Sequence, residues 1–186
     1  MFDSSLITYA VSLHFWREVN EIIYSAMNKI ADQTGNRFMI ENKVPPHITI
    51  GAFHAAKEDE RKLLGLVQAF ASGQQAGTVQ FCEVGNFNNK VLFLRPEKNN
   101  FLTKINAELH DLLLPKFSKA ENGYYLPDIW FPHTTLATGL NSRQFEKALQ
   151  IAGGITLPLE ATIGELAVYQ CSPFAELEKY ILKYKE

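Results

Sequence analysis

The pattern Pro-His-x-Thr, followed by an aliphatic residue, occurs twice in this chain. The first copy lies in PPHITIGAF, residues 45–53, and the second in FPHTTLATG, residues 131–139. In an extended strand, residues i and i+2 point to the same face of the sheet. Each copy therefore predicts a strand that presents a histidine and a threonine together on one face while its aliphatic neighbours turn to the buried side.

Hydrophobic periodicity places these two strands in a series of strands and helices. Apolar residues recur at three- and four-residue spacing in the expected helices and form short β-rich runs in the expected strands. Residues 118–128 lack periodicity and predict a surface loop before the second motif. Besides the motif strands, which begin at 47 and 133, we expect strands at 6–15, 78–87, 90–94, 162–171 and 177–184, and helices at 16–33, 58–71, 100–114 and 142–152.

The order of these elements repeats weakly along the chain. His47 and His133 stand 86 positions apart, and the strands that follow them keep nearly the same offset. Each half reads strand, helix, motif strand, helix, strand. We therefore expect a single domain made of two similar lobes, residues 1–88 and 89–186, that face each other across a cleft.

The composition argues against several classes of protein. A chain of 186 residues that is 46% hydrophobic can bury one ordinary core. Its 18 Lys and Arg against 20 Asp and Glu lack the basic excess of proteins that grip long duplex nucleic acid, although a small or terminal nucleotide remains a possible substrate. Cys82 and Cys171 lack metal or disulfide spacing and predict free thiols.

The amino-terminal apolar run is interrupted by Tyr9, Ser12 and His14, so it resembles neither a signal peptide nor a membrane span. We expect a cytoplasmic protein that makes no membrane contact and is a monomer.

If the two motif strands lie side by side, His47, Thr49, His133 and Thr135 converge on one cleft. With unperturbed pKa values of about 6.5, two imidazoles can hold one proton between them near neutral pH and act as acid and base. Such a pair can activate a water and protonate a departing ribose oxygen, while the threonine hydroxyls donate to phosphate oxygens. A catalytic zinc needs about three close protein ligands, and no histidine cluster supplies them, so we expect neither metal nor cofactor.

The paired PHITI and PHTTL resemble the signature of the two-histidine (2H) phosphoesterase superfamily, which includes bacterial 2'-5' RNA ligase and RNA 2',3'-cyclic phosphodiesterase proteins. The resemblance covers nearly the whole chain in element order and is specific at the two motifs. It implies a bilobal, pseudo-twofold α+β fold with an antiparallel sheet and outer helices in each lobe. It also implies metal-independent chemistry on 2',3'-cyclic phosphates or 2'-5' linkages of RNA ends or nucleotides. By motif matching, His47, Thr49, His133 and Thr135 are the implied catalytic set, with His47 as general acid and His133 as general base.

One departure from the resemblance concerns the charge that meets the phosphate. Bacterial RNA-processing members often carry an arginine shortly after the second motif, where this chain has Ala-Thr-Gly at 137–139. Arg95 or Lys90 could supply positive charge instead. Phe131 shares a face with the second histidine and could stack on a nucleobase, and Tyr9 lies in a strand that frames the cleft.

Of the remaining histidines, only His14 can reach the cleft, from a strand end. Two alternative functions stay open at this point. One is RNA ligation, the reverse reaction at the same site. The other is a non-enzymatic nucleotide or RNA-end binding protein that uses the same pocket without turnover.

Overall fold

The computed structural model describes residues 6–184 of the chain. This range contains the predicted strands and α-helices in the predicted order, together with a short helix at 38–41 and a two-residue strand at 118–119 that were not predicted. The strands are β1 (Leu6–Phe15), β2 (His47–Ala56), β3 (Gly77–Phe87), β4 (Val91–Pro96), β5 (Ser118–Lys119), β6 (Thr134–Ala137), β7 (Leu159–Cys171) and β8 (Phe174–Ile181). The helices are α1 (Arg17–Thr34), α2 (Phe38–Glu41), α3 (Glu60–Gly73), α4 (Asn100–Leu113) and α5 (Ser142–Ala152), with 3₁₀ turns at Lys57–Asp59 and Glu121–Gly123.

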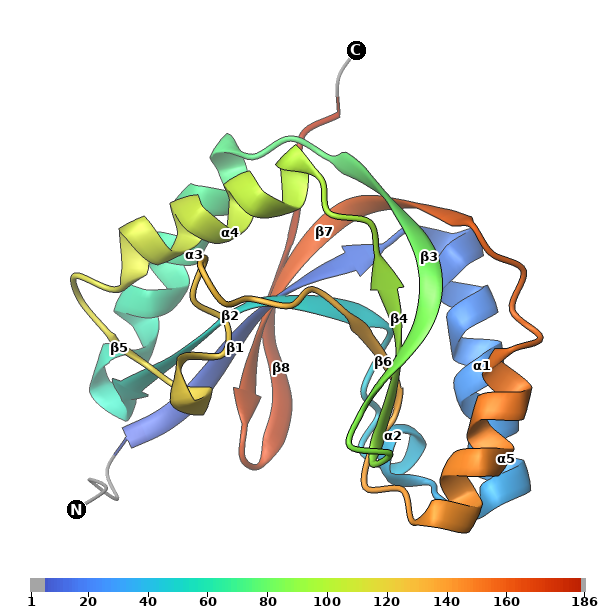
Figure 1. Ribbon diagram of the computed structural model, residues 1–186. Coiled ribbons are helices and arrows are strands. Elements are labelled where there is room, and N and C mark those ends of the chain that lie inside the picture. Colours follow the sequence, from blue (N-terminus) through green and yellow to red (C-terminus); the bar gives the residue numbers. More distant parts are fainter. Residues whose placement is uncertain (1–5, 185–186) are drawn as a thin grey trace.

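The strands form an antiparallel sheet in the order β5-β2-β1-β7-β3-β4-β6, and β8 pairs with β7 (Figure 1). The long strand β7 connects two groups of strands, because its first part pairs with β3 and its later part pairs with β1. The expected α+β fold with antiparallel sheets and outer helices is confirmed. The two sheets that we expected share strand β7 and so form one continuous sheet.

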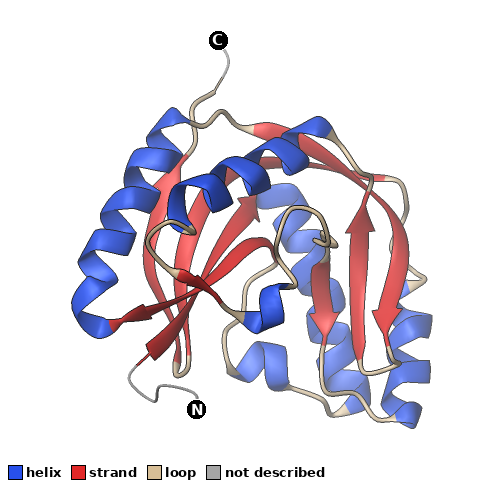
Figure 2. Ribbon diagram, turned by 60° about the vertical axis from the view of Figure 1, so that its left-hand side comes forward, coloured by secondary structure: helices blue, strands red, loops and turns tan. Residues whose placement is uncertain are grey.

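The helices cover the strands in two pairs. Helices α3 and α4 pack together on one side of the molecule, and α1 and α5 pack together on the other (Figures 1 and 2). Helix α1, from the first half of the sequence, contacts the second motif strand β6, while α4, from the second half, contacts the first motif strand β2. The two halves of the sequence are therefore interleaved in space. The division into lobes 1–88 and 89–186 stays a prediction.

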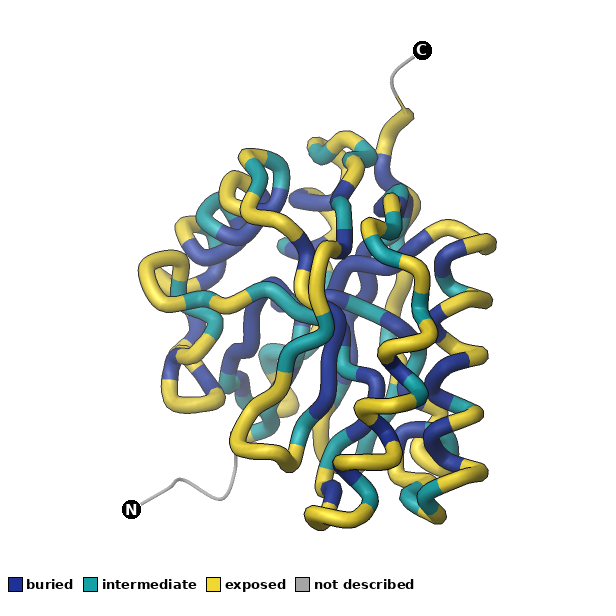
Figure 3. The backbone as a smooth tube through the Cα atoms, turned by 45° about the vertical axis from the view of Figure 1, so that its right-hand side comes forward, coloured by how far each residue is buried: buried dark blue, intermediate teal, exposed yellow. Residues whose placement is uncertain are grey.

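Local signals explain where the helices begin and end. Gly35 takes the left-handed conformation that ends α1, with φ of 73°, which only glycine adopts without strain. At the start of α5, the Asn141 and Gln144 side chains form a reciprocal capping box with each other's backbone N–H groups. Figure 3 shows buried residues along the central strands and exposed residues on the outward turns of the helices, as amphipathic helices over a sheet require.

Several boundaries differ from the sequence-based expectation. Strand β6 begins at Thr134, so that His133 lies just before it, α3 is shifted by two residues along the chain, and β7 begins three residues earlier, at Leu159. The expected loop over residues 118–128 begins with the two-residue strand β5, which pairs with Phe53 and His54 of β2 and is too short to show a period. Strand β8 begins three residues earlier than expected, because the tight β7–β8 hairpin pairs Cys171 with Phe174. Among residues 6–184, no helix is long and apolar enough to cross a bilayer.

Candidate functional site

The two motif histidines are held by equivalent local hydrogen bonds. The Nδ1–H of His47 donates to the carbonyl oxygen of Pro45 at 2.7 Å, and the Nδ1–H of His133 donates to that of Phe131 at 2.8 Å. Because a carbonyl oxygen can only accept, each ring carries a proton on Nδ1. In both histidines, Nε2 is therefore the atom that is left to gain or lose a proton.

The motif residues line two adjoining cavities. His47, Thr49 and Thr135 line a cavity of about 270 Å³, and His133 and Phe131 line another of about 650 Å³. The two cavities share four lining residues: Val91, Glu121, Tyr125 and Thr138. We call the combined space the motif cleft. The structure thus brings all four motif side chains to one cleft.

The imidazoles of the motif cleft influence each other's protonation. Burial lowers the pKa of His133, and burial together with the charge of His133 lowers the pKa of His47, against the opposing effect of the Pro45 carbonyl. Since a charge on one ring disfavours a charge on the other, protonation of Nε2 in both rings at once is disfavoured. One proton shared by two imidazoles is the state that acid and base catalysis together require.

The threonines follow the alternation that the sequence predicts. Thr135 of β6 is half-buried in the motif cleft, whereas its neighbour Thr134 is fully buried on the opposite face. In β2, the Thr49 hydroxyl lies 3.3 Å from the Ser12 hydroxyl, and the indole N–H of Trp130 donates to the Thr49 carbonyl at 3.1 Å. The Trp130 bond ties β2 to the segment that leads into β6.

Each imidazole also packs against aromatic rings. Phe87 and Phe93 each lie with ring centroids 5.1 Å from that of His133. Gly85 lies opposite Phe93 in the β3–β4 pairing, and a methyl group at residue 85 would overlap the Phe93 ring. His47 has a different setting, since its ring neighbours are polar and belong to β1 and β7.

The three residues expected to contact the substrate, Phe131, Arg95 and Tyr9, lie in three different settings. Phe131 lines the motif cleft, and its side chain is 38% exposed. The Arg95 guanidinium stacks on the Phe131 ring, 4.9 Å from its centroid, and pairs with Glu83 at 2.7 Å, so Arg95 approaches the cleft only through Phe131. Tyr9 is fully buried, its hydroxyl donates to Glu60 at 2.9 Å, and it is not brought to the cleft.

Sequence reasoning did not select several residues of the site. Glu121 comes from the aperiodic segment before β6, where no pattern indicates which side chains face a cavity. Ser12 lies beside Thr49. Its two-residue spacing from His14 is a same-face signal that could have been recognised in the expected strand.

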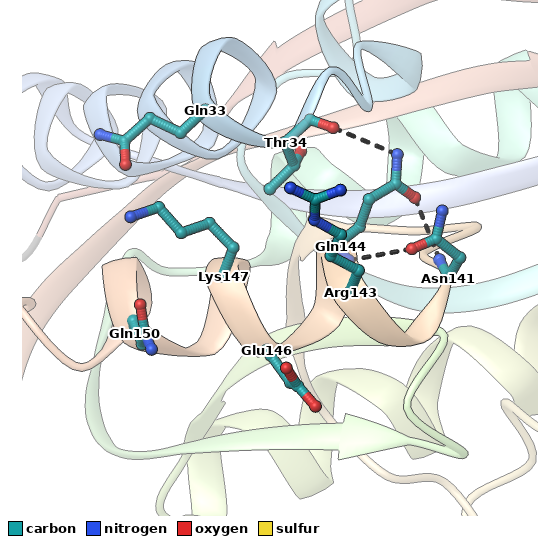
Figure 4. Close-up of a pocket in the computed structure, with 8 residues that line it drawn as sticks. All are labelled: Gln33, Thr34, Asn141, Arg143, Gln144, Glu146, Lys147 and Gln150. Carbon is teal, nitrogen blue, oxygen red and sulfur yellow. Dashed lines mark hydrogen bonds between the residues drawn. The ribbon is translucent and has the colours of Figure 1, made fainter.

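The described part of the motif cleft is poor in permanent positive charge. Among residues 6–184, the lining includes no lysine or arginine, and no group of three or more His, Cys, Asp or Glu side chains is placed to hold a metal ion. A separate polar groove of about 650 Å³ lies between the end of α1 and α5 (Figure 4). None of the four motif residues lines that groove.

Comparisons with known proteins agree with this site. Residues 14–172 match the model of the 2'-5' RNA ligase superfamily. One relative is a protein of Bacillus cereus strain B4264 that is named as a phosphoesterase by assignment. It is 31% identical to this chain over 109 residues, which cover 57% of this chain and 59% of the relative. The chain thus matches about three fifths of the length of the curated relatives.

Solved structures share the fold. E. coli LigT complexed with 3'-AMP superposes with a TM-score of 0.61 and 14% identity, over 95% of this chain and 98% of LigT. The protein TT0787 of Thermus thermophilus gives a TM-score of 0.61 and 18% identity, over 97% of this chain and 100% of that protein. The family match spans both motif strands and the fold agrees over nearly the full length, so the chain belongs to the 2'-5' RNA ligase superfamily of two-histidine phosphoesterases.

Proposed function

We propose that this protein is a metal-independent phosphodiesterase that opens 2',3'-cyclic phosphates or cleaves 2'-5' linkages of RNA ends or nucleotides. One observation carries the proposal: two histidines, each with Nδ1–H bonded to a carbonyl two residues earlier, share one cleft. In the proposed reaction, one Nε2 takes a proton from a water whose oxygen attacks phosphorus. The other Nε2 gives its proton to the ribose oxygen as its bond to phosphorus breaks. The product is a phosphate monoester with a free ribose hydroxyl.

The division of roles between the histidines follows the family resemblance, with His47 as acid and His133 as base. An activated leaving group needs little protonation, so it tests this division directly. A nitrophenyl phosphodiester should largely restore the turnover of His47→Ala and leave His133→Ala impaired. The opposite pattern would exchange the two roles.

The chemistry of the motif cleft supports a nucleotide substrate. The hydroxyls of Thr49 and Thr135 are suited to donate to non-bridging phosphate oxygens. The larger cavity, beside His133, has a volume within the usual range for small ligands and is lined by aromatic rings that include Phe131 and Tyr124. E. coli LigT, which shares the fold, has been solved in complex with 3'-AMP, and this supports a nucleotide ligand for this chain.

The test is turnover of 2',3'-cyclic nucleotides and 2'-5' dinucleotides in the presence of a chelator, with the products identified by chromatography. Loss of either histidine should cost about a hundredfold to ten-thousandfold in turnover. Thr134→Val, which changes only the buried face of β6, is the matched control and should retain activity. If neither substrate class turns over, the enzymatic proposal fails.

A second function is favoured by one observation, the missing positive charge after the second motif. With Ala137, Thr138 and Gly139 there and no cation among the described lining residues, the cleft could bind a nucleotide or RNA end without turning it over. Tight binding without product, unchanged by His47→Ala, would support this binder and contradict the enzyme.

A further inference from the structure

A third imidazole lies beside His47 and is not used by the proposed chemistry. His14 of β1 is directly opposite His47 in the β1–β2 pairing, and β1 also pairs with β7 (Figure 1). The rings of His14 and His47 are stacked, with centroids 6.0 Å apart and planes inclined by 29°. His14 is 4% exposed, so its partners are protein groups.

A chain of hydrogen bonds fixes the proton of His14. The Tyr169 hydroxyl donates its single proton to the Glu176 carboxylate at 2.7 Å. The Tyr169 oxygen lies 3.2 Å from Nε2 of His14, so it can only accept there, and His14 must carry a proton on Nε2. Because the motif histidines carry theirs on Nδ1, His14 is held in the opposite tautomer, and its Nε2 is not available for proton transfer to substrate.

The groups around His14 keep it uncharged. Burial, followed by the charges of His47 and Lys179, holds its pKa well below the usual value. Lys179 in turn lies 3.5 Å from Glu176 and 3.8 Å from Glu165, which is opposite His14 on β7. His14 is therefore a neutral ring when His47 is protonated.

We propose that His14 is a positioning residue that presents its neutral ring to His47 and favours the protonated form of His47. This inference rests on the proposed acid and base role of His47. A cation is stabilised within about 6 Å of the face of a Trp, Tyr or Phe ring. We extend this to the neutral imidazole of His14, whose face the Glu176 carboxylate makes more negative through Tyr169. The stacking opposes burial and the charge of His133, which both favour neutral His47.

Two substitutions separate the effect of the His14 ring from the effect of its hydrogen bond to Tyr169. His14→Gln keeps an N–H that can reach Tyr169 but removes the ring, whereas His14→Phe keeps a ring and removes the N–H. His54→Gln is the control, since His54 is another partly buried imidazole of β2 that bonds Thr8 instead of the cleft residues.

The measurement is the pKa of His47 by NMR titration of protein with isotope-labelled histidine, its signal assigned by its loss in His47→Ala. His14→Gln should lower this pKa by about half a unit, and His14→Phe should keep it within about 0.3 unit. The limb of the kcat/KM profile that His47 controls should move by the same amount.

Three results would overturn the inference: an unchanged His47 pKa in His14→Gln, an equal shift in His54→Gln, or a fall of half a unit in His14→Phe. The last result decides the matter if the Gln variant does not fold. Because the NMR titration needs no substrate, its result tests the role of His14 whether or not the protein is a phosphodiesterase.

Discussion

The neighbouring residues Thr134 and Thr135 give a sharp test of how β6 is oriented. The side chain of Thr134 is fully buried, and its hydroxyl oxygen has no hydrogen-bond partner among the described residues. A buried hydroxyl without a partner costs about 1–3 kcal/mol, and valine has nearly the same shape without that group. Thr134→Val should therefore raise the free energy of unfolding by about 1 kcal/mol and leave turnover unchanged.

Thr135→Val should have the opposite signature. Its side chain is half-buried in the motif cleft, where its hydroxyl is suited to donate to the phosphate. Turnover should fall by about a hundredfold or less, because one phosphate donor is lost while others remain, and the unfolding free energy should change by less than about 0.5 kcal/mol.

Urea unfolding of both variants, monitored by circular dichroism, measures the first effect, and turnover measures the second. The stabilisation in Thr134→Val should appear as a higher denaturation midpoint at an unchanged slope, with a melting temperature about 2–4 °C higher. If Thr134→Val is destabilised, its hydroxyl has a partner and the reasoning is refuted. If Thr134→Val loses turnover while Thr135→Val keeps it, the strand presents the other face.

Three further predictions concern charge. The profile of kcat/KM against pH should be bell-shaped, because the active state holds one proton on the two Nε2 atoms. Its optimum should lie below about pH 6.5, since the pKa values of His47 and His133 are both lowered. An optimum above about pH 7.5 would contradict this. The pKa values of buried His14 and His110 are also lowered, so below about pH 6.5 the unfolded chain binds more protons than the folded one. The free energy of unfolding should consequently fall from pH 7 to pH 5, and urea midpoints that stay constant would argue against it. Glu121→Gln removes the lining carboxylate of the motif cleft and should lower KM for an anionic substrate a few-fold at low salt; a raised KM would show that Glu121 contacts the substrate favourably.

The sequence predicts the elements well because their signals are local. The observed bounds of α5 are the expected ones, and α1 ends within one residue of the expected position, since a capping Asn and a terminal Gly lie within a few residues of the helix ends. The same-face spacing of His47 with Thr49 and of His133 with Thr135 is also local, so their shared cleft could be anticipated once the two strands were expected to lie together.

Long-range contacts set what the sequence does not predict. The bond between His14 and Tyr169 joins residues 155 positions apart and depends on the register of β1 with β7. Arg95 was expected near the phosphate, but the pairing of β3 with β4 places it opposite Glu83, which takes up its charge. Tyr9 lies where β1 still alternates, fully buried between half-buried Thr8 and Ala10, but the period-two rule does not indicate which of the two faces meets the cleft.

The most direct test of the central claim is hydrolysis of 2',3'-cyclic AMP with and without a chelator, in the native protein and in His47→Ala and His133→Ala. The account predicts turnover to an adenosine monophosphate at a rate that the chelator leaves unchanged, and a loss of at least about a hundredfold in each variant. Turnover that the chelator abolishes and zinc or manganese restores would contradict the account, because a metal-bound water would then do the work assigned to the imidazole pair.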